Sequence, residues 1–262
     1  MTGAIIGDIA GSRFEFNNHR SKDFEIFHKD SFFTDDTVMT IAVAFALMHH
    51  EGDLPQLTAH WMQRLGRFYP GLSYGNSFQS WIDGDIKGPY NSFGNGAAMR
   101  VSPCAWVAKS LDEAIQLSEN VTAVTHNHPE GIKGAEAVTV ATYMALHGAN
   151  KKDIYRDMKE YYDLDFTIDE IRPKYGFDET CQGTVPVAIR AFYEADSFED
   201  AIRTAVSVGG DSDTLAAITG SIAEAYWGVP TAMQYQALRK LDLPLRGMVL
   251  DFEHIYGNKL KG

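Results

Sequence analysis

Apolar residues recur along most of the chain at helical spacing and rarely alternate as they do in strands. Segments that are apolar almost all round predict buried helices. These segments are 37–49, 96–109, 131–147, 185–195 and 214–227. Segments with one charged face predict helices at the surface. They are 55–68, 112–124, 151–162, 198–207 and 231–241. The pattern therefore predicts an all-α fold, a compact helical globule.

A further helix is predicted at the N-terminus, where Gly3, Gly7 and Gly11 recur every four residues on one face. Asp8 interrupts this short apolar run, which argues against a membrane-spanning Gly-x-x-x-Gly helix. A face without side chains lets helix axes approach closely. We therefore expect this helix to pack tightly against another helix inside the protein.

Nothing in the chain marks a domain boundary. At 262 residues its length suits one large domain, and no repeat or low-complexity linker interrupts it. The stretch 151–179 is the most charged and aromatic part. We interpret it as a surface excursion of a single domain that spans residues 1–262.

Composition and charge limit the classes of partner. Acidic residues (35) outnumber basic ones (23), which gives a net charge of −12. Lysines cluster only at Lys151-Lys152 and in the tail at Lys259 and Lys261. A nucleic-acid surface normally shows a basic patch, so this class of partner is not expected. An anionic ligand would need help from backbone amides or from bound cations.

Neither the start of the chain nor its cysteines indicate export. The first residues lack the basic leader of a signal peptide, and no apolar run approaches the roughly 18 residues that span a bilayer. Cys104 and Cys181 form neither a disulfide framework nor a C-x-x-C pair. We expect a cytoplasmic, reduced protein that is monomeric and has no membrane partner.

Two short acidic motifs each stand directly before an apolar segment. The first is Thr34-Asp35-Asp36-Thr37, and the second is Asp211-Ser212-Asp213-Thr214 after two glycines. Taken singly, each has an ordinary explanation. Thr and Asp are good N-caps, and acidic residues in the first turn interact favourably with the helix dipole.

Taken together, the two motifs offer more oxygen atoms than capping requires. Adjacent carboxylates repel unless a cation lies between them. Hard divalent ions prefer carboxylate, hydroxyl and water oxygens, and no Cys or His spacing resembles a zinc site. The candidate ligands are Thr34, Asp35, Asp36, Asp211, Asp213 and Thr214. Two metal ions held by this set could bridge a water and orient ligand hydroxyl groups.

Glu15 lies just beyond the predicted N-terminal helix, where its carboxylate could face such a site. It lies outside both acidic motifs, so a role in proton transfer is more natural than a role as a metal ligand. The alternative is an ordinary surface glutamate at a helix end. One metal-site aspartate, Asp36 or Asp211, is a second candidate for proton transfer.

Two further motifs are weak on their own. A Gly-rich turn containing Gly94, Asn95, Gly96 and Ala97 leads into an apolar segment, and exposed amides at such a turn can hold a phosphate. It is neither a dinucleotide fingerprint nor a Walker loop. The pair His126 and His128 precedes another helix. Such histidines could bind a metal but more often cap or hydrogen-bond locally.

The order of these motifs resembles the ADP-ribosylglycohydrolase family over residues 3 to 228. Cys181-Gln182-Gly183-Thr184-Val185-Pro186 also resembles a Gly-x-Val-Pro element of that family. The other matching motifs are Gly7-Asp8 with Gly11 and Glu15, Thr34-Asp35-Asp36-Thr37, Gly94-Asn95-Gly96-Ala97 with Met99-Arg100, Thr125-His126-Asn127-His128-Pro129 and Gly210-Asp211-Ser212-Asp213-Thr214.

The resemblance implies the all-α fold of that family, a compact orthogonal helical globule, and hydrolysis of the glycosidic bond between ADP-ribose and an acceptor. It further implies two Mg²⁺ ions, or Mn²⁺, held by the two acidic motifs. The diphosphate would lie on the loop from Gly94 to Ala97, with His126 or His128 lining the same cleft. The acceptor, an ADP-ribosylated protein or small molecule, is left open. Arginine is the first expectation, with serine, a nucleobase or a metabolite as alternatives, and loops including 151–179 would shape that side.

Two other functions share these features. A non-catalytic ADP-ribose-binding protein would lack Glu15 or a metal-site aspartate, and all of these positions are present. A Mg²⁺-dependent nucleotide phosphohydrolase would commonly add Lys or Arg to its cleft. Only Arg100 lies near the Gly-rich loop.

Overall fold

The computed structural model describes residues 1–257, and within this range the chain forms helices and no strand. One isolated bridge joins Gly94 to Thr180. The helices are α1 (Thr2–Gly11), α2 (Asp35–Met48), α3 (Leu54–Phe68), α4 (Asn76–Asp83), α5 (Gly96–Met99), α6 (Ser102–Val107), α7 (Leu111–Thr122), α8 (Pro129–Leu146), α9 (Lys151–Met158), α10 (Ile168–Ile171), α11 (Cys181–Glu194), α12 (Phe198–Val206), α13 (Ser212–Trp227), α14 (Thr231–Lys240) and α15 (Leu243–Phe252), with a π-helix η1 (Glu253–Gly257). The predicted all-α class is confirmed. The lysines at 259 and 261 lie outside the described residues.

The predicted helices correspond to observed ones except over 96–109, which the structure divides into α5 and α6. Pro103 lies in the first turn of α6 and has no N–H to donate to the carbonyl of Met99. That carbonyl instead accepts a hydrogen bond from the Thr40 hydroxyl at 3.3 Å. The apolar pattern therefore continues through a position at which the α-helical hydrogen bonding of the backbone is interrupted. Helices α4, α10 and α15 were not predicted.

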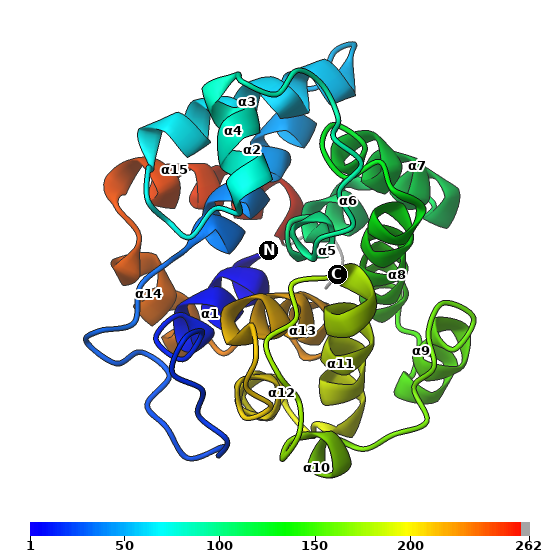
Figure 1. Ribbon diagram of the computed structural model, residues 1–262. Helices are drawn as coiled ribbons and strands as arrows, with labels where there is room; N and C mark the ends of the chain where they lie inside the picture. The colour runs from blue at the N-terminus through cyan, green and yellow to red at the C-terminus, as the bar shows by residue number, and fades with distance from the viewer. Residues whose placement is uncertain (258–262) are drawn as a thin grey trace.

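Helices α1 and α13 lie side by side at the centre of the molecule, and the other helices surround them (Figure 1). Helix α1 also packs against α2, α12 and α14, while α13 packs against α8, α11 and α12. Every residue of α1 is buried. The N-terminal helix thus contacts both helices that follow the acidic motifs, and most extensively α13.

The predicted close approach of α1 is confirmed at its glycine face. A Cβ atom added at Gly3 would lie 2.2 Å from the carbonyl oxygen of Gly220, and one at Gly7 would lie 2.0 Å from that of Ala216. At Gly11 the nearest atoms, at 2.4 Å, belong to Ser212 and Asp213. No side chain fits at these three positions while α13 keeps its place.

The charged stretch 151–179 runs along the periphery, where α9 and α10 lie outside α8 and α11 (Figure 1). Its last residues turn back toward the centre of the molecule, where Phe177 lines a cleft. Among residues 1–257, no helix is both long enough and apolar enough to span a bilayer.

Candidate active site

The starts of α2 and α13, the segment after α1 and the Gly-rich loop before α5 line one cleft of about 620 Å³. Six of its lining residues are acidic, and Arg100 is the one Lys or Arg among them. The lining residues that sequence analysis predicted are Glu15, Asp35, Asp36, Gly94, Asn95, Gly96, His126, Asp211, Asp213 and Thr214. Segments far apart in the sequence therefore meet at one place.

Asp8 holds the first acidic motif in position. Its buried carboxylate accepts hydrogen bonds from the backbone amides of Thr34 at 2.8 Å and Thr37 at 3.0 Å. It also accepts from the hydroxyl groups of both threonines. The Thr34 side chain thus donates to Asp8 and makes no capping bond in α2. Local capping does not explain Thr34, and its oxygen keeps lone pairs for another ligand.

The second acidic motif is held by α1 and by the Gly-rich loop. The Ser212 hydroxyl donates to the carbonyl of Gly11 at 3.0 Å, at the point where α1 and α13 meet. The Asn95 side-chain amide donates to Asp211 at 2.7 Å. The Thr214 hydroxyl donates to Asp36 at 3.1 Å, which joins the two motifs directly. Both aspartate-bearing helix starts are therefore fixed relative to one another.

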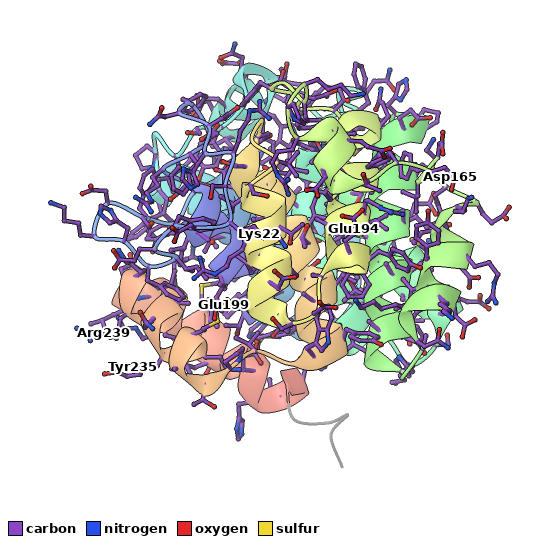
Figure 2. All side chains as sticks on the ribbon, turned by 90° about the horizontal axis from the view of Figure 1, so that it is seen from below. Lys22, Asp165, Glu194, Glu199, Tyr235 and Arg239 are labelled. Carbon is purple, nitrogen blue, oxygen red and sulfur yellow. The ribbon has the colours of Figure 1, made fainter. Side chains whose placement is uncertain are left out.

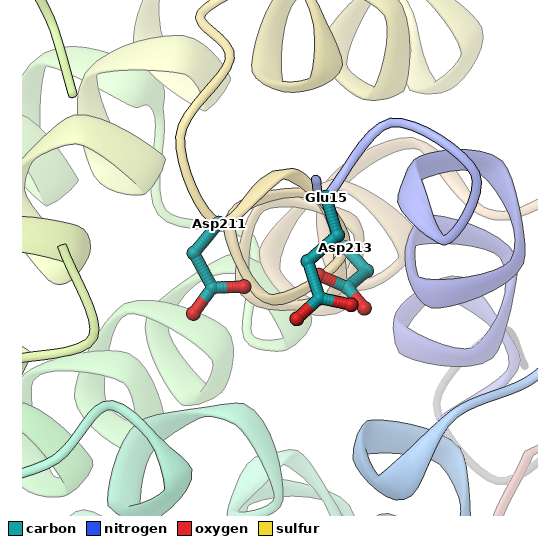
Figure 3. Close-up of side chains that lie close together, drawn as sticks. All are labelled: Glu15, Asp211 and Asp213. Carbon is teal, nitrogen blue, oxygen red and sulfur yellow. The ribbon is translucent and has the colours of Figure 1, made fainter. Parts of the chain in front are cut away.

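Glu15, Asp211 and Asp213 converge at the start of α13, as Figure 3 shows. One carboxylate oxygen from each lies within 4.8 Å of the others, which is the spacing of ligands around one cation. At 9 %, 6 % and 2 % exposure, these three groups are largely withdrawn from solvent. Sequence analysis placed Glu15 outside the ligand set, whereas the structure brings it within reach of that set.

Burial and mutual repulsion raise the pKa values of these carboxyl groups. Burial, followed by the charges of Asp211 and Asp8, raises the pKa of Glu15 to about 7. Burial and then the neighbouring acids raise the pKa of Asp35, Asp36 and Asp213 well above the usual range. Such a cluster stays ionised only when a positive charge offsets the repulsion.

A divalent cation fits this donor set. One oxygen of Asp36, Oδ1, is buried without a hydrogen-bond partner among the described residues. Buried carboxylate oxygens without partners are costly, so a ligand is expected there. The neighbouring groups are carboxylates and hydroxyls, the donors that Mg²⁺ and Mn²⁺ prefer. Geometry and donor chemistry thus agree with the metal site predicted from the motifs.

The Gly-rich loop offers fewer free amides than its sequence suggests. The amide of Gly94 donates to the Ser92 hydroxyl at 3.2 Å, and that of Asn95 donates to the Glu179 carbonyl at 2.7 Å. The amide of Ala97 donates to the Gly94 carbonyl at 3.1 Å. Three of the four predicted phosphate donors therefore already have acceptors in the protein.

A buried chain of polar groups supplies other donors beside this loop. Arg100 donates to the Thr125 hydroxyl at 2.7 Å, and that hydroxyl lies 2.7 Å from Nδ1 of His126. Burial, and then the charge of Arg100, lowers the pKa of His126 well below its usual value. Because Arg100 can only donate, Nδ1 of the neutral ring is best assigned as the acceptor and Nε2 as the N–H. A Cβ added at Gly94 or Gly96 would lie 3.5 or 3.4 Å from that Nε2.

Three predicted residues lie outside the cleft lining. Thr34 is fully buried beneath it, and Ala97 is buried in α5. His128 begins α8, where its Nδ1 accepts the Glu130 amide at 3.1 Å. That bond is the local capping role weighed as the alternative for this histidine pair.

Sequence analysis did not assign the residues that support the site. Asp8 was noted as an interruption of an apolar helix and as part of a family motif, but no role was assigned to it. A lone acid in such a helix is itself a signal, because a buried charge requires partners. Asn18 and Arg20 hold loops together through backbone atoms, and Phe177 lines the cleft from a distant loop. These contacts leave no pattern in the sequence.

Comparisons with known proteins agree with this geometry. The chain is 22% identical to mouse ADP-ribosylhydrolase ARH3, with 87% of this chain and 83% of the relative covered. It is 26% identical to the ADP-ribosylarginine hydrolase Tri1 of Pseudomonas putida, with 87% and 70% covered. It is 27% identical to the ADP-ribosyl-[dinitrogen reductase] glycohydrolase of Rhodospirillum rubrum, with 75% and 69% covered.

A solved structure described as an ADP-ribosylglycohydrolase-related protein complex has the same fold, with a TM-score of 0.71 at 22% identity. The superposition covers 97% of this chain and 96% of that one. The family model named ADP-ribosylglycohydrolase matches residues 1–254. The chain therefore belongs to the ADP-ribosylglycohydrolase family and is an enzyme that hydrolyses glycosidic bonds of ADP-ribose.

Proposed function

We propose that this enzyme releases ADP-ribose from arginine side chains with the help of two Mg²⁺ ions. The observation that carries the proposal is the meeting of two acidic motifs and Glu15 in one cleft, with Asp36 Oδ1 left without a partner. Six residues that line the cleft are acidic and Arg100 is the one Lys or Arg among them, a charge balance that suits a cationic acceptor. The relative from Pseudomonas putida carries the name ADP-ribosylarginine hydrolase.

The proposed metal ligands are the two acidic motifs with their threonines. They are Thr34, Asp35, Asp36, Asp211, Asp213 and Thr214. When bound, divalent ions would fix the hydroxyl groups of the distal ribose and activate a water. The Asp8 hydrogen bonds to Thr34 and the Asn95 bond to Asp211 orient these ligands before any ion arrives.

The protein groups nearest the scissile bond would stabilise positive charge and carry a proton. Cleavage of a glycosidic bond builds positive charge on the sugar, which nearby carboxylates stabilise. Glu15 is the proposed proton carrier because its carboxylate lines the cleft within reach of Asp211 and Asp213 but lies outside the two acidic motifs. Asp36 and Asp211 are the alternative carriers, since each lies beside the same ligands.

The other end of the substrate would lie along the Gly-rich loop. Its diphosphate needs donors, and Nε2–H of His126 and the positive charge of Arg100 supplement the amide of Gly96 there. A side chain at Gly94 or Gly96 would stand between the substrate and His126. Recognition of this end thus depends on a neutral His126 and on Gly94 and Gly96, which leave the space beside its ring open.

The experiment is hydrolysis of an ADP-ribosyl-arginine peptide, with free ADP-ribose tested separately as a substrate. We expect release of intact ADP-ribose, loss of activity in EDTA, and recovery when Mg²⁺ or Mn²⁺ is added. Asp213→Ala should lower kcat by more than about 10³-fold because it removes a proposed metal ligand. Full turnover after exhaustive chelation would exclude the metal mechanism. Formation of AMP would instead indicate a phosphohydrolase.

A further inference from the structure

Two phenylalanine rings stack on one another at the rim of the cleft. Phe16 is 78% exposed and Phe177 is 51% exposed, and their ring centroids lie 6.1 Å apart with planes 21° from parallel. Phe177 lines the cleft, and Phe16 directly follows Glu15 in the chain. Large apolar side chains exposed together commonly mark a binding surface. This pair, the Phe16–Phe177 platform, has no role in the site described above.

Hydrogen bonds hold in place the two backbone segments that carry the rings of the platform. Asn18 joins the segment of Phe16 to the second acidic motif, because its side chain accepts the Gly210 amide at 2.9 Å and donates to the Gly210 carbonyl at 3.1 Å. The same amide group donates to the carbonyl of Glu15 at 3.1 Å. The start of the platform is therefore fixed to both Glu15 and the turn before Asp211.

Arg20 fixes the segment that carries Phe177. Its guanidinium donates to the carbonyls of Val208 at 2.6 Å and Tyr175 at 2.5 Å, and also to that of Arg172. The ring of Tyr175 lies so close to Gly210 that an added Cβ would be 2.5 Å from it. The loop that carries Phe177 is thus anchored two residues earlier, at Tyr175. Both rings stay exposed although they stack on one another.

Charge around the platform favours a cation. Glu15 precedes Phe16, and the exposed Glu179 follows Phe177 by two residues and also lines the cleft. The guanidinium of Arg20 is already engaged by three carbonyls, and Arg172 donates to Ser207 and Asp169. Exposed aromatic faces beside carboxylates bind planar cations well, above all guanidinium.

We propose that the Phe16–Phe177 platform receives the acceptor side of the substrate and stacks against the guanidinium of the ADP-ribosylated arginine. The inference rests on the proposed function. It assigns acceptor choice to two residues at the reacting end of the cleft, beside Glu15. The ADP-ribose half would lie elsewhere, along the Gly-rich loop and its own aromatic neighbours Tyr90 and Phe93.

The test compares an ADP-ribosyl-arginine peptide with an ADP-ribosyl-serine peptide of the same sequence. For Phe16→Ala and Phe177→Ala we expect kcat/KM on the arginine substrate to fall about 5- to 30-fold, mainly through KM, as for loss of a stacked cation. Hydrolysis of the serine substrate and calorimetric affinity for ADP-ribose should change less than about twofold. Phe177→Trp keeps an aromatic face and should retain most of the preference.

Tyr235→Ala is the matched control, since Tyr235 is 63% exposed and lies on α14, beside Arg239 (Figure 2). It should leave both substrates unaffected. Equal losses on both peptides, or weaker ADP-ribose binding in Phe177→Ala, would show that the platform does not read the acceptor. If the wild type hydrolyses the arginine peptide and the variants do so equally well, this inference fails alone. If the wild type leaves that peptide intact, the proposed arginine activity fails first.

Discussion

At the scale of single residues, Glu15 is the group whose role the structure sharpens most. Its carboxylate lies within reach of Asp211 and Asp213, and burial with these charges raises its pKa to about 7. A group with that pKa can exchange a proton near neutral pH. The same position would also allow it to bind a metal ion.

Glu15→Gln separates these two roles. The amide keeps the size of the side chain but cannot titrate, so kcat should fall about 10²- to 10⁴-fold if Glu15 carries a proton. Metal content and ADP-ribose affinity should stay near those of the wild type. Single-turnover rates, metal analysis and calorimetry provide the measurements. Near-normal turnover would remove Glu15 from the mechanism, and loss of one ion would make it a ligand.

Asp8 acts through the residues it holds. Its carboxylate accepts bonds from two amides and two hydroxyls of Thr34 and Thr37, and burial raises its pKa to about 6 although these bonds lower it. Asp8→Asn would replace one accepting carboxylate oxygen by an NH₂ group, which would face the N–H and O–H donors of Thr34 or Thr37. We expect it to destabilise the fold by about 3 kcal/mol, as for unsatisfied buried groups. It should also weaken metal binding about 10- to 100-fold.

Denaturant unfolding and metal calorimetry measure both effects. Asp53→Asn is the control, because Asp53 caps α3 through the Gln56 amide at 3.0 Å and asparagine caps equally well. It should change neither quantity. Normal metal affinity in folded Asp8→Asn protein would show that Thr34 needs no support from Asp8.

At the scale of elements, α1 positions both acidic motifs. Asp8 holds the start of α2, while Gly7 and Gly11 let the backbone of α13 lie directly against α1. A change in the distance between α1 and α13 would therefore move Asp211 and Asp213 relative to Asp35 and Asp36. The glycine face of α1 therefore sets the distance between the two acidic motifs as well as the packing of the two helices.

Gly7→Ala tests this dependence. Its Cβ would lie 2.0 Å from the Ala216 carbonyl, so α13 must shift. We expect a loss of stability of about 3 kcal/mol, the upper part of the usual range for overpacking, and weaker metal binding. Gly247→Ala in α15 is the control, since nothing lies within 4 Å of its added Cβ. There alanine should stabilise the helix by up to about 1 kcal/mol. Thermal melts that rank the two variants in the opposite order would contradict this packing.

At the scale of the whole molecule, we expect metal binding and folding to be coupled through the carboxylate cluster. Without a cation, Glu15 and Asp8 bind protons more tightly in the folded state than when unfolded, since their pKa values are raised to about 7 and about 6. Their contribution to stability is therefore present at low pH and lost as pH rises through these values. A bound divalent ion would remove this loss.

Melting temperatures in EDTA and in Mg²⁺ should thus diverge as pH rises from about 5 to about 8. We expect the EDTA curve to fall over this range and the Mg²⁺ curve to stay flatter. At a metal concentration of about 100 times Kd the ion should add about 2.7 kcal/mol. NaCl at matched ionic strength is the control. Parallel curves in EDTA and Mg²⁺ would show that the cluster does not bind the ion.

The sequence by itself determined most of the segments that are helical, and it marked the residues whose chemistry we propose. Helical periodicity is a local property, so most helices, and the glycine face of the N-terminal helix, could be predicted from it. The acidic motifs could be recognised because neighbouring carboxylates need a shared cation. The division of 96–109 has a signal in the sequence, Pro103, which the apolar pattern alone does not register. The bond by which Thr40 satisfies the carbonyl freed there comes from another helix and has no local signal.

Only the tertiary structure decided which of these residues meet. Glu15 joins Asp211 and Asp213, and His128 turns to cap its own helix while His126 faces the loop. The amides of the Gly-rich loop find acceptors in Ser92 and Glu179. The bonds at His128 and Ser92 are local. The meeting of Glu15 with Asp211 and Asp213, the approach of His126 to the loop and the bond to Glu179 depend on contacts between segments that are distant in the chain. No local pattern encodes such contacts, because burial, charge interactions and hydrogen bonds depend on which groups are close in space and not on which are close in the sequence.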